Sequence, residues 1–302
     1  MASFDRLFAM VKLLDDADMD IVKQIEQELL KVSEEDLAIL KTIAKSHPDL
    51  PAVERLNYII GEHSIQKVRQ SMEEWLVKGG QNLFEGLCLL STYRYPEISR
   101  QSLSNQLDQI KLDVWLELKP DMTPLEKIRI FNRVFYKEYG FNGNMKDYFS
   151  EENSYINKAI ENRTANPITI SCIYSIIAHR LGLPIFGVNL PQHFILAYVD
   201  NFKFIKKKPI QGYNYLNPGE YSGVSFYINA FNDGAIFSRW NIDQYLKQLK
   251  IPQDERYYKP CSNIEIIMRM CRNLIWSYQK NNEMSAADDM VKLLRHIENA
   301  SS

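Results

Sequence analysis

Residues 163–198 constrain the fold of this chain more than any other segment. Asn166 is a favoured N-cap, and the fixed φ angle of Pro167 suits the first position of a helix. Apolar residues then occupy nearly every face over residues 168–181, which indicates a buried helix rather than an amphipathic surface helix. Gly182 supplies the left-handed conformation at which helices commonly end. The segment therefore predicts a capped and buried helix that ends just before Gly182.

Two short apolar runs follow this helix, at residues 185–188 and 194–199. Pro184 prevents the helix from continuing, and turn-forming residues separate the two runs, so we predict two strands joined by a turn. Cys172 lies on the predicted helix, and His193 opens the second predicted strand. A thiol and an imidazole are the two groups that cysteine-based nucleophilic catalysis requires.

The composition is that of a globular chain with no dominant charge. The chain has 302 residues, of which 45% are hydrophobic and 25% charged, and its formal net charge is −2. This length is enough for two or three packed units. Because there is no overall basic field, we expect no nucleic-acid partner. The one basic run, at residues 206–208, indicates a solvated hairpin or loop end rather than a phosphate-binding patch.

The cysteines and histidines show no spacing typical of a metal site. The five histidines lack the His-Glu-x-x-His pattern, and Cys-x-x-Cys pairs are absent from the four cysteines, which are Cys88, Cys172, Cys261 and Cys271. We therefore expect reduced thiols, no bound metal and no cofactor. The N-terminus lacks the features of a secretory signal, and no window approaches about 18 uninterrupted apolar residues. We expect a cytoplasmic protein that does not contact a membrane.

Helical periodicity dominates the first part of the chain. We predict a helical domain over residues 1–118, whose first two helices resemble a HEAT-type hairpin. The acidic turn between them has a simpler explanation, because Asp16 or Asp18 can cap the second helix. Later in this domain, the pattern predicts helices over residues 72–93 and 99–118.

The end of the chain is also predicted to be helical. Residues 241–302 contain a short helix and then two longer helices, at 263–280 and 284–297, which resemble a truncated tetratricopeptide hairpin. A single pair of helices cannot bury its own apolar face, so we expect this hairpin to pack on the rest of the molecule. The region between the two helical flanks, residues 119–240, is predicted to form the core domain.

Several separated motifs in this core resemble one known family. They are Tyr-Gly-Phe-Asn-Gly-Asn at 139–144, Asn-Ser-Tyr-Ile at 153–156, Asn-Pro-Ile-Thr-Ile at 166–170, Arg-Leu-Gly-Leu-Pro at 180–184, Gly-Val-Asn-Leu-Pro-Gln-His-Phe at 187–194 and Phe-Tyr-Ile-Asn-Ala-Phe-Asn-Asp-Gly at 226–234. In this order, the motifs resemble the transglutaminase-like proteins of the SirB-one type. The resemblance covers residues 120–240 well and the helical flanks more loosely.

The resemblance implies a fold and a set of candidate site residues. The implied fold is α+β and mostly helical, with a transglutaminase-like, papain-like core in which a central buried helix packs on a small antiparallel sheet. In such a core, a helix-borne Cys, a strand-borne His and an Asp or Asn on the next strand form a triad. Here these residues would be Cys172, His193 and Asn229. The thiolate would attack an acyl carbon, the imidazole would move the proton, and the third residue would fix the imidazole tautomer.

The position of the thiol departs from this pattern. In catalytic members of the family, the nucleophilic Cys opens the helix, a position that corresponds to the neighbourhood of Pro167 here. Cys172 is farther into the helix by about five residues, which rotates it by about 140° and moves it about 7.5 Å along the axis. A buried structural role for Cys172 is the alternative. His193 and Asn229 have structural alternatives too, as a hydrogen-bonded residue at a strand start and as a residue that ends a strand before a turn.

Two functions therefore remain open from the sequence. In the first, the chain is a transglutaminase-like protein that lacks thiol catalysis and serves as a regulatory or binding module for a protein or peptide partner. In the second, it is a cysteine-dependent acyl-transfer enzyme, either a transglutaminase or a peptidase or amidase, that uses Cys172, His193 and Asn229. The two differ in geometry, because catalysis requires the Cys172 thiol near His193 in a cleft, whereas the first function predicts a buried, inert thiol.

Overall fold

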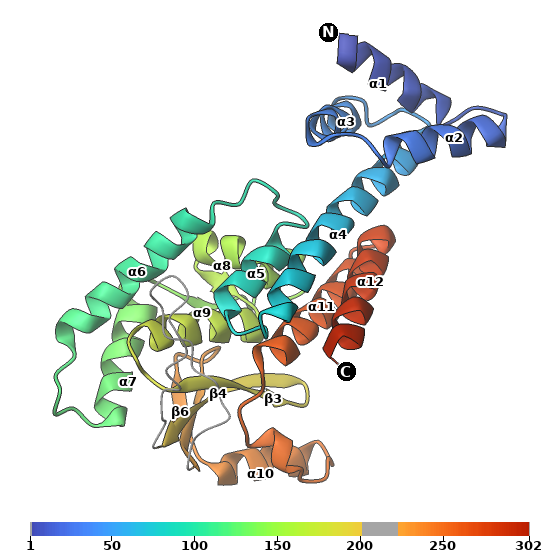
Figure 1. Cartoon of the computed structure of the whole chain (residues 1–302). Helices are drawn as coiled ribbons and strands as arrows, with labels where there is room; N and C mark the ends of the chain where they lie inside the picture. The colour runs from blue at the N-terminus through green and yellow to red at the C-terminus, as the bar shows by residue number, and fades with distance from the viewer. Residues whose placement is uncertain (1, 201–222, 302) are drawn as a thin grey trace.

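The computed structural model describes residues 2–200 and 223–301 of the chain, and the basic run at 206–208 lies outside them. The described chain is mostly helical with two small sheets, which agrees with the predicted α+β class. Figure 1 shows a body built around the larger sheet and a group of N-terminal helices that projects away from it.

Four helices form the projecting N-terminal unit. They are α1 (Ala2–Leu13), α2 (Met19–Leu29), α3 (Glu34–Ser46) and the first half of α4 (Val53–Val77). Their apolar faces share a hydrophobic cluster of their own, which includes Leu7, Val11, Leu29, Leu40, Ile43, Leu56 and Ile59. The Asp18 side chain accepts a hydrogen bond from the Asp20 amide and so caps α2, as one of the two explanations of the acidic turn predicts.

The second half of α4 enters the main hydrophobic cluster of the body, where it packs with α5 (Leu83–Ser91) and α12 (Met284–Ser301). The stretch predicted to be helical at residues 72–93 is divided in two, because α4 ends at Val77 and α5 begins six residues later. Two glycines with positive φ, Gly79 at +83° and Gly80 at +61°, cause the break, since this conformation cannot continue an α-helix. The next helix, α6 (Arg100–Glu117), confirms the prediction over residues 99–118.

A series of short elements leads to the central helix. They are α7 (Pro124–Asn132), the π-helix η1 (Arg133–Glu138), β1 (Asn142–Gly143), the 3-10 helix η2 (Glu151–Ser154), α8 (Ile156–Asn162) and β2 (Thr164–Ala165). The two-residue strands β1 and β2 pair in parallel, which brings the start of α9 (Pro167–Arg180) beside the Asn142 loop. The prediction of a capped and buried helix is confirmed, since residues 168–178 of α9 are all buried and Gly182 has φ +74°.

The larger sheet has four antiparallel strands in the order β3-β4-β5-β6. They are β3 (Ile185–Leu190), β4 (His193–Asp200), β5 (Gly223–Asn229) and β6 (Ala235–Phe237), and the first two confirm the predicted strand pair. Side chains alternate between the two faces along each strand. Phe194, Leu196 and Ile228 pack in the cluster that contains α9, whereas Ile195, Ala197 and Tyr227 pack against α10 (Arg239–Gln248).

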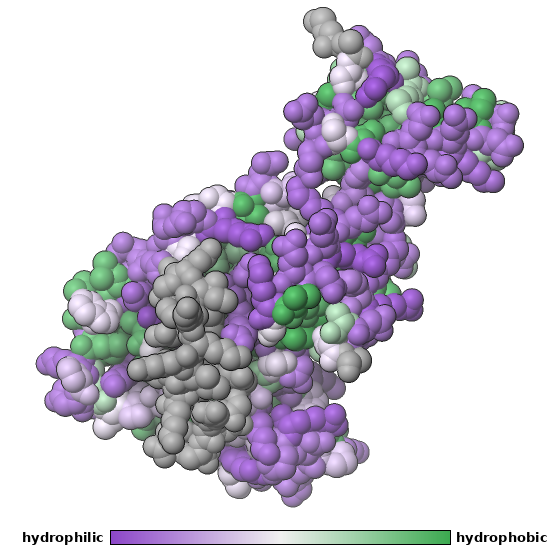
Figure 2. Space-filling model, viewed as in Figure 1, coloured by the Kyte–Doolittle hydropathy of each residue, from purple (hydrophilic) through white to green (hydrophobic). Residues whose placement is uncertain are grey.

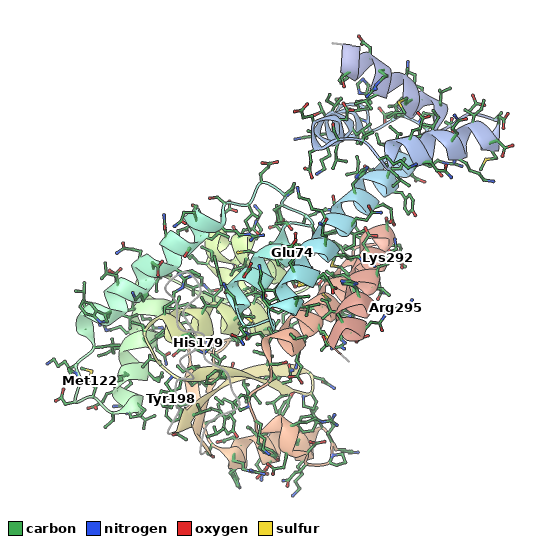
Figure 3. The ribbon with its side chains drawn as sticks, viewed as in Figure 1. Glu74, Met122, His179, Tyr198, Lys292 and Arg295 are labelled. Carbon is green, nitrogen blue, oxygen red and sulfur yellow. The ribbon has the colours of Figure 1, made fainter. Side chains whose placement is uncertain are left out.

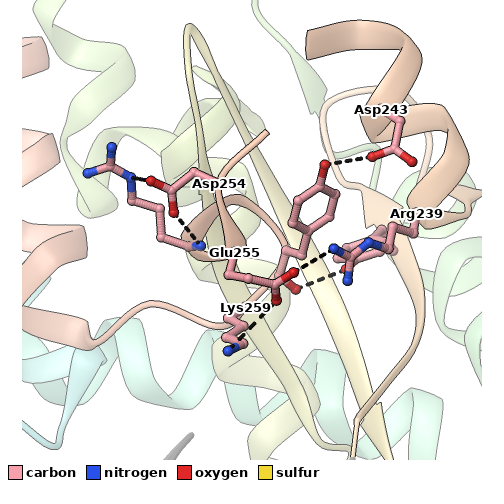
Figure 4. Close-up of polar contacts among 8 residues, drawn as sticks. Arg239, Asp243, Asp254, Glu255 and Lys259 are labelled. Atoms are coloured by element: carbon pink, nitrogen blue, oxygen red, sulfur yellow. Dashed lines mark hydrogen bonds and ion pairs between the residues drawn. The ribbon is translucent and has the colours of Figure 1, made fainter. Parts of the chain in front are cut away.

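A polar network ties the segment after α10 to that helix (Figure 4). Arg239 forms an ion pair with Glu255 at 2.7 Å, and its guanidinium lies 3.9 Å from the ring centre of Tyr258. The Tyr258 hydroxyl donates to Asp243 Oδ1 at 2.6 Å. The ion-paired groups are exposed, so each pair contributes little to stability and the network mainly fixes the short helix η3 (Glu255–Tyr257) in place.

Helices α11 (Asn263–Lys280) and α12 are the two longer helices predicted at the end of the chain. As expected, the hairpin packs on the rest of the molecule, with α12 along α4 and α11 against α5 and α9. Figure 3 shows Lys292 on α12 close to α4, where its ammonium group pairs with both Glu62 and the buried Asp289. The Tyr93 hydroxyl donates to the same Asp289 carboxylate at 2.8 Å, so the contact joins α4, α12 and the turn after α5.

Candidate functional site

The N-terminus of α9 is held by its cap and by the loop before α8. Asn166 Oδ1 accepts a hydrogen bond from the Thr169 amide at 3.0 Å, which is the expected N-cap geometry. The Asn166 amide group donates to Ser154 Oγ at 2.8 Å. All three residues are buried, so the cap fixes the start of α9 against η2 as well as satisfying the helix.

Two further asparagines organise the neighbouring loop. Asn153 Nδ2 donates to the carbonyl oxygen of Asp147 at 2.7 Å, and Asn153 Oδ1 accepts from Asn144 Nδ2 at 2.8 Å. The Asn153 carbonyl accepts from the Asn166 amide at 3.4 Å. This network places Tyr148 beside the first turn of α9.

A cavity of about 150 Å³ opens at this end of α9. It lies between α9, the β3–β4 turn, α11 and the Tyr148 loop. Its lining residues are Tyr148, residues 166–168, residues 192–194, Arg269, Asn273, Trp276 and Ser277. His193 is therefore the one predicted triad member that reaches this cavity, because neither Cys172 nor Asn229 lines it.

Cys172 lies in the core on the second turn of α9. The residue is 1% exposed, and burial raises the pKa of its thiol well above the usual range, with a smaller contribution from the nearby Cys261 thiol. Cys261 in turn donates to the carbonyl oxygen of Gly187 on β3 at 3.2 Å. Within the described residues, no hydrogen bond joins Cys172 to His193. The Cys172 side chain thus packs in the main hydrophobic cluster and does not line the cavity.

His193 opens β4 at the wall of the cavity. Burial lowers the pKa of its imidazole, and the neighbouring Arg269 charge lowers it further. The ring centre lies 6.2 Å from that of Tyr245 on α10. The neutral imidazole is therefore favoured at neutral pH, which leaves one ring nitrogen able to accept a proton or a hydrogen bond.

Asn229 ends β5 and shapes the turn that follows it. Its Oδ1 accepts from the Phe231 amide at 3.1 Å, and its carbonyl oxygen accepts from the amides of Asn232 and Gly234. Leu196 on β4 pairs with Ile228, so Asn229 and His193 lie near the same end of the sheet. The hydrogen bonds of Asn229 match the turn-forming role that the sequence left open for it.

Sequence reasoning missed the contribution of α11 to the cavity. Arg269 Nη1 donates to the Leu190 carbonyl at 2.8 Å and to Asn189 Oδ1 at 3.2 Å, and its Nη2 donates to the His193 carbonyl at 2.9 Å. The side chain therefore clamps both ends of the β3–β4 turn. The sequence did contain a signal for this role of Arg269, because the residue lies among the apolar residues Ile266, Ile267, Met268 and Met270. An arginine in such a run requires internal partners or a functional role.

Within residues 2–200 and 223–301, no three His, Cys, Asp or Glu side chains lie close enough together to hold a metal ion. The helices of the same part of the chain include none that is long and apolar enough to cross a bilayer.

A helix whose capped N-terminus meets a strand histidine at a cavity is the arrangement expected of a transglutaminase-like protein. The profile of the transglutaminase-like superfamily matches residues 101–272, which is more than half of the chain. The chain belongs to this superfamily. The matched region begins in α6 and ends in α11, so it includes every residue that lines the cavity except Asn273, Trp276 and Ser277.

Several curated proteins are similar to the chain. A UPF0162 protein of Xylella fastidiosa (strain 9a5c) is 28% identical over 172 residues, which are 56% of this chain and 56% of that protein. A UPF0162 protein of Vibrio cholerae is 27% identical over 136 residues, or 45% and 47% of the two chains. F-box only protein 21 of Homo sapiens is 40% identical over 67 residues, or 22% of this chain and 11% of that protein.

The chain thus spans about half the length of the first two of these relatives. No solved structure matches it.

Proposed function

We propose that this chain is a SirB-one-type transglutaminase-like protein that lacks thiol catalysis and uses its cavity and surface to bind a protein or peptide partner. One observation carries the proposal. The α9 residues that line the cavity are Pro167 and Ile168, whereas the only thiol on α9 is that of the buried Cys172.

The chemistry of thiols explains why this arrangement opposes catalysis. The nucleophile in cysteine enzymes is the thiolate, which helix N-termini and neighbouring cations stabilise. Cys172 has the opposite environment, because its burial raises the thiol pKa. Its sulfur also has no route to an acyl carbon in the cavity, since Cys172 does not line it.

Two exposed surfaces support a binding role. Around the cavity, Tyr148, Phe149 and Trp276 are exposed aromatic side chains, and the rings of Phe149 and Trp276 meet edge to face at 4.7 Å. Aromatic rims of this kind are typical of peptide-binding sites. At the far end of α6, Leu112, Trp115 and Leu116 are exposed on one helix face, 59% in the case of Trp115.

Figure 2 shows this α6 surface as an apolar area on the outer edge of the body. Leu125 at the start of α7 is also exposed. Residues three and four apart share one side of a helix, so the three α6 side chains form a continuous apolar surface. Such patches often mark protein interaction sites.

Intact-mass labelling of the native protein with limiting iodoacetamide, from about pH 5 to 8, tests the absence of thiol catalysis. We expect Cys172 to remain unmodified in the wild type. In Pro167→Cys, we expect alkylation of the introduced thiol at least roughly tenfold faster than that of Cys172, because a thiol at the first turn of a helix is stabilised as the thiolate.

The matched control is His193→Ala in both backgrounds. The change that His193→Ala causes in the alkylation rate of the introduced thiol measures how strongly His193 can activate a nucleophile in the cavity. Rapid alkylation of Cys172 below about pH 7 that disappears in His193→Ala would refute the proposal, because it would reveal a histidine-activated thiolate. The enzyme hypothesis with Cys172, His193 and Asn229 would then replace it.

A further inference from the structure

The cavity contains a cation, Arg269, that has no anionic partner among the described residues. The three hydrogen bonds of Arg269 go to two carbonyl oxygens and one amide oxygen, all of which are uncharged. Within residues 2–200 and 223–301, no carboxylate lies within ion-pair distance of its guanidinium. These bonds use three of the five N–H donors of the side chain, which leaves the Nε donor and one Nη2 donor without a partner among the described residues.

The other lining groups add donors and no negative charge. The lining residues include no Asp or Glu. The side chains of Asn273 and Ser277 are polar, and neither donates a hydrogen bond to another described residue. The amide of Ile168 lies in the first turn of α9, where helix amides have no partner within the helix and carry partial positive charge.

We infer that this cavity binds a peptide carboxylate, with Arg269 as its cationic anchor and the exposed aromatic side chains of Tyr148 and Trp276 against the adjoining apolar part of the peptide. The inference rests on the proposed binding function and names the chemistry of the ligand. A carboxylate fits because the two unused donors of Arg269 are adjacent on the guanidinium and match the two oxygens of one carboxylate. A single cation and about 150 Å³ suit one carboxyl group with a short side chain or chain end.

The carboxylate can come from a chain terminus or from an acidic side chain, and three short peptides distinguish these sources. They are N-acetyl-Ala-Phe with a free carboxylate, N-acetyl-Phe-Glu-amide and the neutral N-acetyl-Ala-Phe-amide. Binding to the full chain is followed by the indole signals of ¹⁵N-tryptophan-labelled protein. The chain has four tryptophans, and loss of one signal in Trp276→Phe assigns the resonance of the cavity.

We expect at least one of the two acidic peptides to shift the Trp276 signal, with an affinity at least about tenfold above that of the neutral amide. The acid that binds more tightly identifies the source of the carboxylate. Equal binding of the neutral amide, or no shift of the Trp276 signal with either acid, would overturn the inference.

A pair of isosteric variants locates the effect without disturbing the turn that Arg269 clamps. Asn273→Asp places a carboxylate on the cavity wall, and we expect it to weaken acid binding by roughly tenfold. Gln279→Glu adds the same charge to the exposed side of α11 outside the cavity, and we expect little change. Equal effects of the two variants would overturn the assignment to the cavity. The iodoacetamide experiment measures the reactivity of Cys172 and not the binding of acids. Carboxylate binding can therefore be disproved while the proposed non-catalytic function stands.

Discussion

Replacement of His179 by Gln should remove a defined part of the acid sensitivity of this fold. Figure 3 labels His179 near the end of α9, where the helix meets the sheet. Its Nε2 lies 2.6 Å from the Ile185 carbonyl oxygen on β3, and its ring centre is 4.9 Å from that of Phe186. Burial lowers the pKa of the imidazole from 6.5 to about 4, against a smaller opposite effect of the Ile185 carbonyl.

The direction in which stability changes with pH follows from the lowered pKa of His179. The unfolded chain takes up a proton at His179 as the pH falls below about 6.5, whereas the folded chain does so only near pH 4. The contribution to stability is therefore complete above pH 6.5 and is lost progressively between pH 6.5 and pH 4. Each unit of pKa difference corresponds to about 1.36 kcal/mol, so the loss reaches at most about 2 kcal/mol at pH 5 and about 3 kcal/mol near pH 4. Partial exposure of His179 makes these figures upper limits.

Urea unfolding followed by far-ultraviolet circular dichroism at pH 7.5 and pH 5 measures this difference. His179→Gln keeps a donor for the Ile185 carbonyl but cannot be protonated. The free energy of unfolding of the wild type should fall by up to about 2 kcal/mol more than that of the variant between the two pH values. An identical fall in both proteins would refute the assignment of this proton to His179.

Three further changes have expected outcomes. Asn166→Ala removes the cap of α9 and leaves a buried hydroxyl without its donor, and it should lower the free energy of unfolding by roughly 2 kcal/mol in urea denaturation; a change below about 0.5 kcal/mol would contradict the role of the cap. Gly143→Ala would place a Cβ atom within 2.4 Å of the Phe231 ring, so the melting temperature should fall. An unchanged melting temperature would show that this ring moves freely. Leu40→Ala should destabilise the N-terminal cluster by about 2–5 kcal/mol. Hydrogen exchange should then quicken in α1–α3 and not in α9, and uniform quickening would argue against a separate N-terminal core.

Local signals explain which parts of the fold were predictable. Asn166 and Pro167 specify the start of α9, and Gly182 specifies its end, because capping and left-handed backbone depend on adjacent residues alone. The strands after it and the C-terminal helix pair follow from equally local periodicity. The glycine pair at 79–80 carried a similar signal, and the apolar residues on both sides of it obscured the break.

The cavity could not be derived in the same way. His193 was recognised because it lies in a motif, whereas Arg269 reaches the same cavity from a helix that begins 70 residues later. Only the packing of α11 against α9 brings the two together, and no local pattern specifies that packing. A buried position for Cys172 was predictable, since free cysteines are among the most buried residues and nearly every face of its helix is apolar.

The two halves of helix α4 belong to different hydrophobic cores, so α4 couples the N-terminal helices mechanically to the body. Leu56 and Ile59 are held by the N-terminal cluster, whereas Ile65 and Val68 are held by the body. Gly61 lies between the part of α4 in the N-terminal cluster and the part in the body. An added Cβ at Gly61 would lie 3.1 Å from the Asp289 carboxylate. A bend of about 10° there would move the start of α4, about 12 Å away, by roughly 2 Å. A protein that bound α1–α3 and displaced them would therefore strain the contact between α4 and α12, although it would not touch that contact itself.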